Sequence, residues 1–127
     1  MHTAETQGIR VAAEATYVAV ESDPAAGRFF FAYRIRIENV GDRPARLVSR
    51  HWVITDEVGH VEHVRGPGVV GETPRLEPGE AFEYTSFCPL ATSSGSMRGT
   101  YQMVRDDGAR FDAEIPRFTL LATFLQN

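Results

Sequence analysis

The sequence predicts an all-β fold, a β-sandwich of seven to eight short strands. Three observations carry this prediction. Apolar residues alternate with polar residues at a period of two, which is typical of strands with one buried face. Turn-forming residues separate the alternating segments at short intervals. No segment combines the apolar repeat of an amphipathic helix with capping residues at its ends.

The first alternating segment begins soon after the start of the chain. Ile9 and Val11 share one parity, whereas Val18 and Val20 share the other. A β-bulge adds one residue to a strand and shifts its alternation, so we expect a bulge near residues 12–13.

Residues 28–42 give the clearest strand. One face of this strand is apolar and consists of Phe29, Phe31, Tyr33, Ile35 and Ile37. The other face carries charged residues. With the next strand it is expected to present a basic stripe of Arg34, Arg36, Arg46 and Arg50. Because Glu38 interrupts this stripe, it is interpreted as a solvated face rather than a nucleic-acid site.

Residues 45–59 predict the third strand. Val48, Trp52 and Ile54 share a parity, and Trp52 is expected to pack between the two sheets. The segment "LEPGEAF", residues 76–82, resembles the Leu-x-Pro-Gly-x-x-Tyr corner of fibronectin type III domains, with Phe82 in place of the tyrosine.

The last third of the chain predicts a strand, a hairpin and a final strand. Phe82 and Tyr84 share a face, and Asp107-Gly108 is a strong hairpin signal. The inward positions of this hairpin are Met97, Tyr101, Met103, Phe111, Ala113 and Ile115. The apolar end of the chain is expected to form the last strand.

The 127 residues predict a single domain, with an ordered core from about residue 8 to residue 124. We expect its interior to contain Phe31, Tyr33, Ile35, Trp52, Ile54, Tyr101 and Phe111. The net charge of -4 argues against nucleic acid and anionic membranes as partners, and no apolar stretch is long enough for membrane insertion. A single cysteine without an export signal predicts a cytoplasmic protein, expected as a monomer or a weak homodimer.

The loop "VRGPGVVGETP" has the G-x-G-x-x-G spacing of a dinucleotide-binding turn, formed by Gly66, Gly68 and Gly71. Such a turn must open a helix, whose N-terminal amides hold the pyrophosphate. Pro74 and Pro78 follow too closely to allow that helix. We therefore predict a connection between strands and no cofactor.

Two other uses of this loop are considered. Its amides could form a nest for an anion, with Arg65 and Arg75 on either side. The favoured hypothesis is a recognition surface for a protein partner, formed by Pro67, Val69, Val70 and Glu72. Adjacent valines in an extended loop cannot both face the same core, so at least one of them is expected to be exposed.

Five motifs of the chain are specific enough to indicate a family: "SRHW" (49–52), "VRGPGVVGETP" (64–74), "PGEAFEYTS" (78–86), "GSMRGTYQM" (95–103) and "FDAEIPRFTL" (111–120). Through these motifs the chain closely resembles the ApaG family over nearly its whole length. The resemblance implies a single ApaG domain over residues 1–127, with an immunoglobulin-like, fibronectin type III-like sandwich. It also implies an association with cobalt resistance and magnesium efflux, and a protein-binding role. It implies no catalytic residues.

The link to cobalt and magnesium directs attention to His51, His60, Glu62 and His63. On a strand, His60 and Glu62 share a face while His63 points away, which leaves too few ligands for a closed metal site. No nucleophile–base pair is evident, and Cys88 has no partner at a catalytic spacing. The chain is therefore expected to be a non-catalytic interaction module. The alternatives are a phosphate or nucleotide sensor, using the Gly66–Gly71 loop, and a metal-handling accessory.

Overall fold

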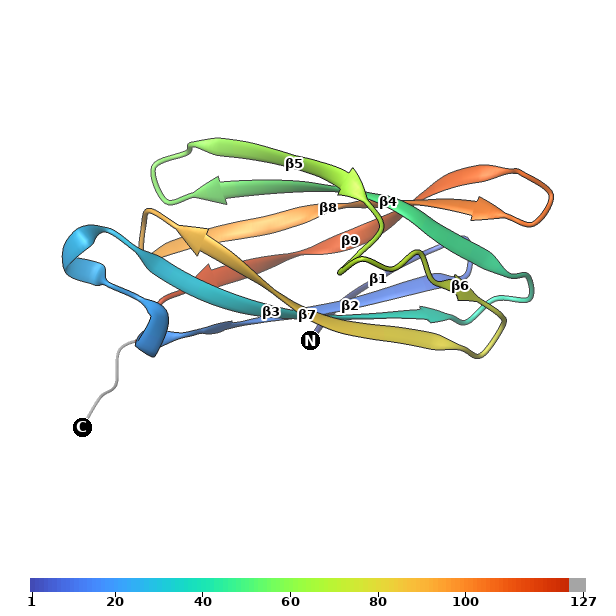
Figure 1. Cartoon of the computed structure of the whole chain (residues 1–127), viewed down its shortest axis with the longest axis horizontal. Coiled ribbons are helices and arrows are strands. Elements are labelled where there is room, and N and C mark those ends of the chain that lie inside the picture. The colour runs from blue at the N-terminus through green and yellow to red at the C-terminus, as the bar shows by residue number, and fades with distance from the viewer. Residues whose placement is uncertain (124–127) are drawn as a thin grey trace.

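The computed structural model of the chain describes residues 1–123, which form two antiparallel sheets packed face to face (Figure 1). The first sheet has the order β1-β2-β3-β7, with bounds His2–Thr6, Ile9–Tyr17, Phe29–Asn39 and Ala81–Leu90. The second has the order β5-β4-β8-β9, with bounds Val61–Pro67, Ala45–Asp56, Ser94–Arg105 and Arg110–Leu121. The two-residue strand β6, Arg75–Leu76, pairs with the start of β4. The predicted all-β sandwich is confirmed.

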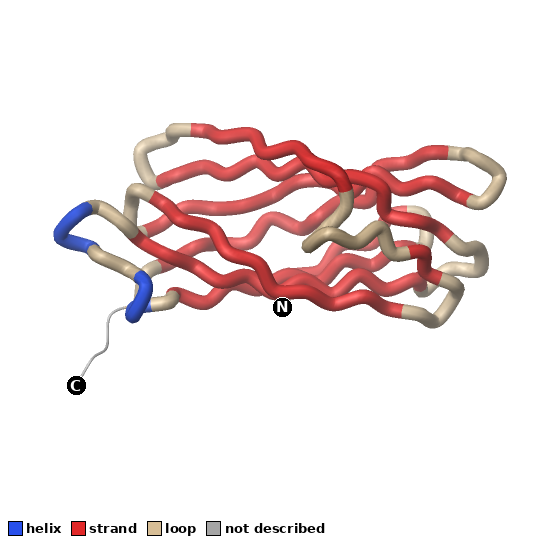
Figure 2. Tube along the Cα trace, viewed as in Figure 1, coloured by secondary structure: helices blue, strands red, loops and turns tan. Residues whose placement is uncertain are grey.

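Strands make up most of the described chain, and two short 3-10 turns join β2 to β3 (Figure 2). These turns are η1, Ala19–Glu21, and η2, Pro24–Ala26. Residues 1–123 contain no helix with the length and apolar composition that a membrane span requires. The β-bulge expected near residues 12–13 is absent, because β2 pairs with β3 without a register shift from Ile9 to Tyr17. The valines that suggested the shift, Val18 and Val20, lie in and beside η1.

A bulge occurs in β4 instead, where the register with β8 shifts between Leu47 and Ser49. Before the bulge the inward residue is Leu47, and Val48 is only partly buried. The predicted inward parity of Val48, Trp52 and Ile54 therefore holds only after the bulge. The N-terminal strand β1 was also not predicted. It lies before the expected start of the core and pairs with β2 through a two-residue turn at Gln7-Gly8. Residue 124, the expected end of the core, lies outside the described residues.

The core lies between the sheets and contains the predicted residues. Phe31, Tyr33, Ile35, Trp52, Tyr101 and Phe111 are all buried, and Ile54 is partly buried against them. Trp52 is at its centre: the ring of Tyr33 from the opposite sheet lies 5.3 Å from its own, centroid to centroid. Phe118 and Tyr101 meet the same indole edge-on, at 6.0 and 6.4 Å. The sheets are thus held together by aromatic contacts around one residue.

The two long sides of the sandwich differ. On one side the edge strand β1 and its neighbour β2 pack against β9, so the sheets close on each other. On the other side the edge strands are β5 and β7, and their outer edges have no strand partner among residues 1–123. The cleft described next lies on this open side.

Candidate functional site

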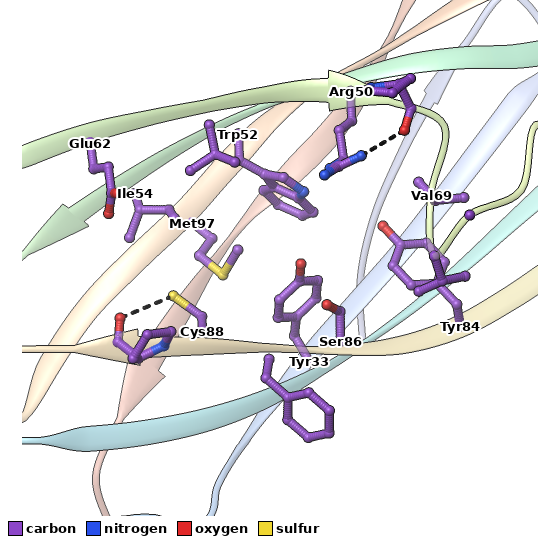
Figure 3. A pocket seen from close by; sticks show the side chains of 16 residues that line it. Tyr33, Arg50, Trp52, Ile54, Glu62, Val69, Tyr84, Ser86, Cys88 and Met97 are labelled. Carbon is purple, nitrogen blue, oxygen red and sulfur yellow. Dashed lines mark hydrogen bonds between the residues drawn. The ribbon is translucent and has the colours of Figure 1, made fainter.

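A cleft of about 530 Å³ lies between the edge strands β5 and β7. Side chains from β3, β4, β5, β7 and β8 line it, and the glycine loop after β5 forms part of its wall (Figure 3). Its volume is in the range of sites that hold small molecules or a few residues of a peptide. Both sheets contribute because the inward-facing positions of β4 and β7 meet here.

Trp52 forms part of the cleft wall and carries an unused hydrogen-bond donor. The residue is only 2% exposed, and its Nε1 atom is buried with no hydrogen-bond partner. A buried indole N–H normally has a partner, because leaving it without one costs about 1–3 kcal/mol. Trp52 is one of the residues that line the cleft, so its indole lies next to the space that a bound group would fill.

Tyr33 and Tyr84 bring hydroxyl groups to the cleft. The Tyr84 and Tyr101 hydroxyls are 2.5 Å apart and share a hydrogen bond. Burial raises the pKa of Tyr33, Tyr84 and Tyr101, and this effect outweighs the lowering effect of nearby Arg50. All three hydroxyls therefore keep their protons at neutral pH and act as neutral hydrogen-bonding groups.

Arg50 joins this cleft to the glycine loop. Its Nη1 atom donates hydrogen bonds to the carbonyl oxygens of Pro67 and Gly68, at 2.8 and 2.9 Å. The expectation that Arg50 belongs to an outer basic stripe is wrong, because Arg50 has the same parity as Trp52 and faces the same side of β4. Figure 3 shows its guanidinium group turned toward the cleft.

The other three arginines of the expected stripe form ion pairs or a hydrogen bond with nearby residues. Arg34 and Arg36 both pair with Glu83, at 2.6 and 3.0 Å, and Arg34 is the main cause of the lowered pKa of Glu83. Arg46 donates to the carbonyl oxygen of Thr73. The four arginines therefore do not form a continuous basic surface.

The structure explains each glycine of the G-x-G-x-x-G motif without a nucleotide. A Cβ atom at Gly66 would lie 2.9 Å from Nη2 of Arg50, so this glycine leaves room for the guanidinium group. At Gly68 a Cβ would lie 2.3 Å from the carbonyl oxygen of Glu72. Gly71 has a φ of 80° in a tight turn. No helix follows, as predicted, and the loop leads to β6.

The two valines of the loop have opposite environments. Val69 is 1% exposed and belongs to the core, whereas Val70 is 55% exposed. Reciprocal hydrogen bonds between Val69 and Glu72 close a two-residue turn over Val70 and Gly71. Val70 has a φ of 44°, a left-handed conformation that is strained for a β-branched side chain. The prediction that at least one valine is exposed is confirmed, and Val69 supports the loop from below.

The candidate anion ligands are separated in space. Arg75 pairs with Asp106 at 2.5 Å and with Glu77 at 3.0 Å. Arg65 lies on β5 opposite His51. The loop amides of Gly68, Val69 and Glu72 all donate to backbone carbonyl groups. The amides and cations that an anion nest requires are therefore largely used within the fold.

The candidate metal ligands are also divided between two faces. His63 meets His51 on the outer face of the second sheet, with 2.9 Å between Nδ1 of His63 and Nε2 of His51. Partial burial, then Arg65 and His63, lower the pKa of His51. Glu62 faces the cleft, and His60 precedes β5. Within residues 1–123, no three His, Cys, Asp or Glu side chains are grouped so that they could hold a metal ion.

Cys88 lines the cleft from β7 and is buried. Burial raises the pKa of its thiol to about 11, and the nearby Glu62 adds to the effect. The thiol is therefore protonated at neutral pH, which disfavours a role as a nucleophile. The sequence pattern did not indicate that Cys88, Glu62, Arg50 and Trp52 line one cleft.

Comparisons with known proteins agree with this description. A family model, the ApaG domain, matches residues 19–105. The chain is 58% identical to Protein ApaG of Anaeromyxobacter dehalogenans over 121 residues, 95% of each chain. It is 59% identical to Protein ApaG of Thiobacillus denitrificans over 112 residues, 88% of each chain. A crystal structure of a protein from Bordetella pertussis has a TM-score of 0.87 and 50% identity, covering 89% of this chain and 92% of that one.

Proposed function

We propose that this chain, which belongs to the ApaG family, is a non-catalytic domain that binds an extended segment of a protein partner in the cleft between β5 and β7. One observation carries the proposal: the cleft lies between two sheet edges that have no strand partner among residues 1–123. Free edges offer main-chain donors and acceptors to an added strand, while pockets between them accept its side chains.

The glycine loop is proposed as the outer part of the same surface. Val70 projects from its tip in a strained conformation, and such strain concentrates where a structure serves function. Pro67 limits the conformations of the loop and so reduces the entropy lost on docking. Glu72 closes the turn, and the buried Val69 holds it in place.

The other uses of the chain have weaker support. A phosphate or nucleotide sensor would need loop amides that here donate to carbonyl groups. A metal-handling role would rest on the His51–His63 pair, to which neither Glu62 nor His60 adds a third ligand. The association with cobalt resistance and magnesium efflux is a proposal that follows from the family resemblance. A cytoplasmic location is a proposal that rests on the single, unpaired cysteine.

Replacement of Val70 by asparagine separates a docking role from a structural role. Asparagine tolerates the left-handed conformation and Asn-Gly favours this kind of turn, so we expect V70N to stabilise the protein by about 1 kcal/mol. At the same time the loop loses its apolar contact, so capture of a partner from cell lysate should fall. Unfolding in urea measures the first effect, and quantitative mass spectrometry of captured proteins measures the second.

The matched control is Val20→Asn, because Val20 is exposed in η1 and does not line the cleft. We expect this variant to capture the same partner as the wild type. A V70N protein that is at least as stable as the wild type and captures the same set of proteins at full yield would contradict the proposal.

A further inference from the structure

We infer, on the basis of the proposed function, that the cleft selects its peptide by charge at both ends. The peptide carries a carboxylate beside Arg50, a cationic side chain beside Glu62, and an apolar residue between them. This inference adds the chemistry of the partner to the site proposed above.

The cleft has a positive end and a negative end. Arg50 lies opposite Gly66, and Glu62 lies opposite Ile54, so the two charges are separated along the β4–β5 pair. Four positions of a strand correspond to about 13 Å. Figure 3 shows Arg50 and Glu62 at opposite ends of the cleft, with the side chains of Trp52, Ile54 and Met97 between them.

Both charges lack a partner of opposite sign within the described chain. Arg50 donates to carbonyl oxygens, and neither Arg50 nor Glu62 forms a salt bridge with another residue among 1–123. Arg34, Arg36 and Arg75, in contrast, are paired with carboxylates. The two ends of the cleft are therefore free to select an occupant of complementary charge.

The groups between the charges also suit a peptide. Trp52 lines the cleft and offers an aromatic surface to the peptide. Ile54, Val64 and Met97 provide an apolar wall for one side chain. An extended segment of about four residues spans the distance between the charges, and the free edges of β5 and β7 run alongside it. A small carboxylate would engage only one end.

A displayed library of random peptides, selected on the full chain, tests this inference. The selected peptides should share an acidic and a basic residue three to five positions apart, with an apolar residue between them. Replacing that basic residue with glutamine should weaken binding about fivefold, as expected for a partly exposed ion pair. Affinity can be measured from the fluorescence of Trp52, the only tryptophan in the chain.

A second selection experiment uses a variant in which the charge of the cleft residue Glu62 is reversed. Selection on Glu62→Lys should return peptides with an acidic residue in place of the basic one. The matched control Glu114→Lys reverses an exposed charge on β9 and should return the wild-type pattern.

Failure of the proposed function and failure of the charge inference give different results. If no peptide is selected, the proposed function itself fails. If peptides bind but lack the charge pattern, or E62K selects the same peptides as the wild type, only the charge inference fails. Self-association that E62K abolishes would identify a second copy of the chain as the occupant, and would also overturn the inference.

Discussion

Replacing Trp52 with alanine is expected to lower the free energy of unfolding by about 3–5 kcal/mol, the usual cost of deleting a buried aromatic side chain. The indole lies between the sheets, in contact with the rings of Tyr33, Tyr101 and Phe118. Alanine leaves these three rings facing a cavity. Because small domains are stable by only about 5–15 kcal/mol, the loss is a large fraction of the total.

Unfolding in guanidinium chloride measures this effect, with Trp52→Phe as the control. Phenylalanine keeps an aromatic ring and removes the unpartnered Nε1 donor, so we expect a much smaller loss than for alanine. An unchanged melting temperature for W52A would show that the indole does not hold the sheets together.

The second large effect is expected at Asn39, which is 0% exposed at the end of β3. Its Nδ2 atom donates to the carbonyl oxygens of Arg43 and Leu76, at 2.8 and 3.0 Å. Its Oδ1 atom accepts from the amide of Gly41 at 3.0 Å. Asn39→Asp keeps the shape but sets a carboxylate against two carbonyl oxygens, so we expect a loss of about 3–5 kcal/mol at neutral pH.

The pH dependence distinguishes this mechanism from a simple loss of packing. A protonated carboxyl group is neutral and can donate to one of the two carbonyl oxygens, so part of the deficit should disappear between neutral pH and about pH 4. Asp42→Asn, an exposed change in the same turn, should alter stability by less than about 0.5 kcal/mol. A deficit of N39D that is the same at both pH values would argue against the proposed cause.

Alternation in the sequence predicted the strands where one face is buried along its whole length. In β3 every predicted inward side chain is buried. The pattern failed at Val18 and Val20, because Val20 is exposed in the 3-10 turn η1 and Val18 directly precedes that turn. It missed β1, whose hairpin turn uses Gln7-Gly8 rather than a common turn pair.

The candidate site was harder to predict, because it depends on which strands form the open side. The sequence grouped Glu62 with the histidines and Arg50 with the outer arginines. The parity of Trp52 was a usable signal for Arg50, since positions 50 and 52 of one strand share a face. No local pattern places β5 beside β7, so the contribution of Cys88 and Tyr84 to the same cleft required the structure.

The indole N–H resonance of Trp52 reports most directly on whether the cleft between β5 and β7 is the binding site. The chain has a single tryptophan, so this signal in a proton–nitrogen correlation spectrum is unambiguous. On addition of a selected peptide we expect the indole signal to shift strongly, because the indole lines the cleft that the peptide fills. Amides of β1 and β9 on the closed side should stay unchanged. An unchanged indole signal, with shifts confined to β1 and β9, would contradict the assignment of the site.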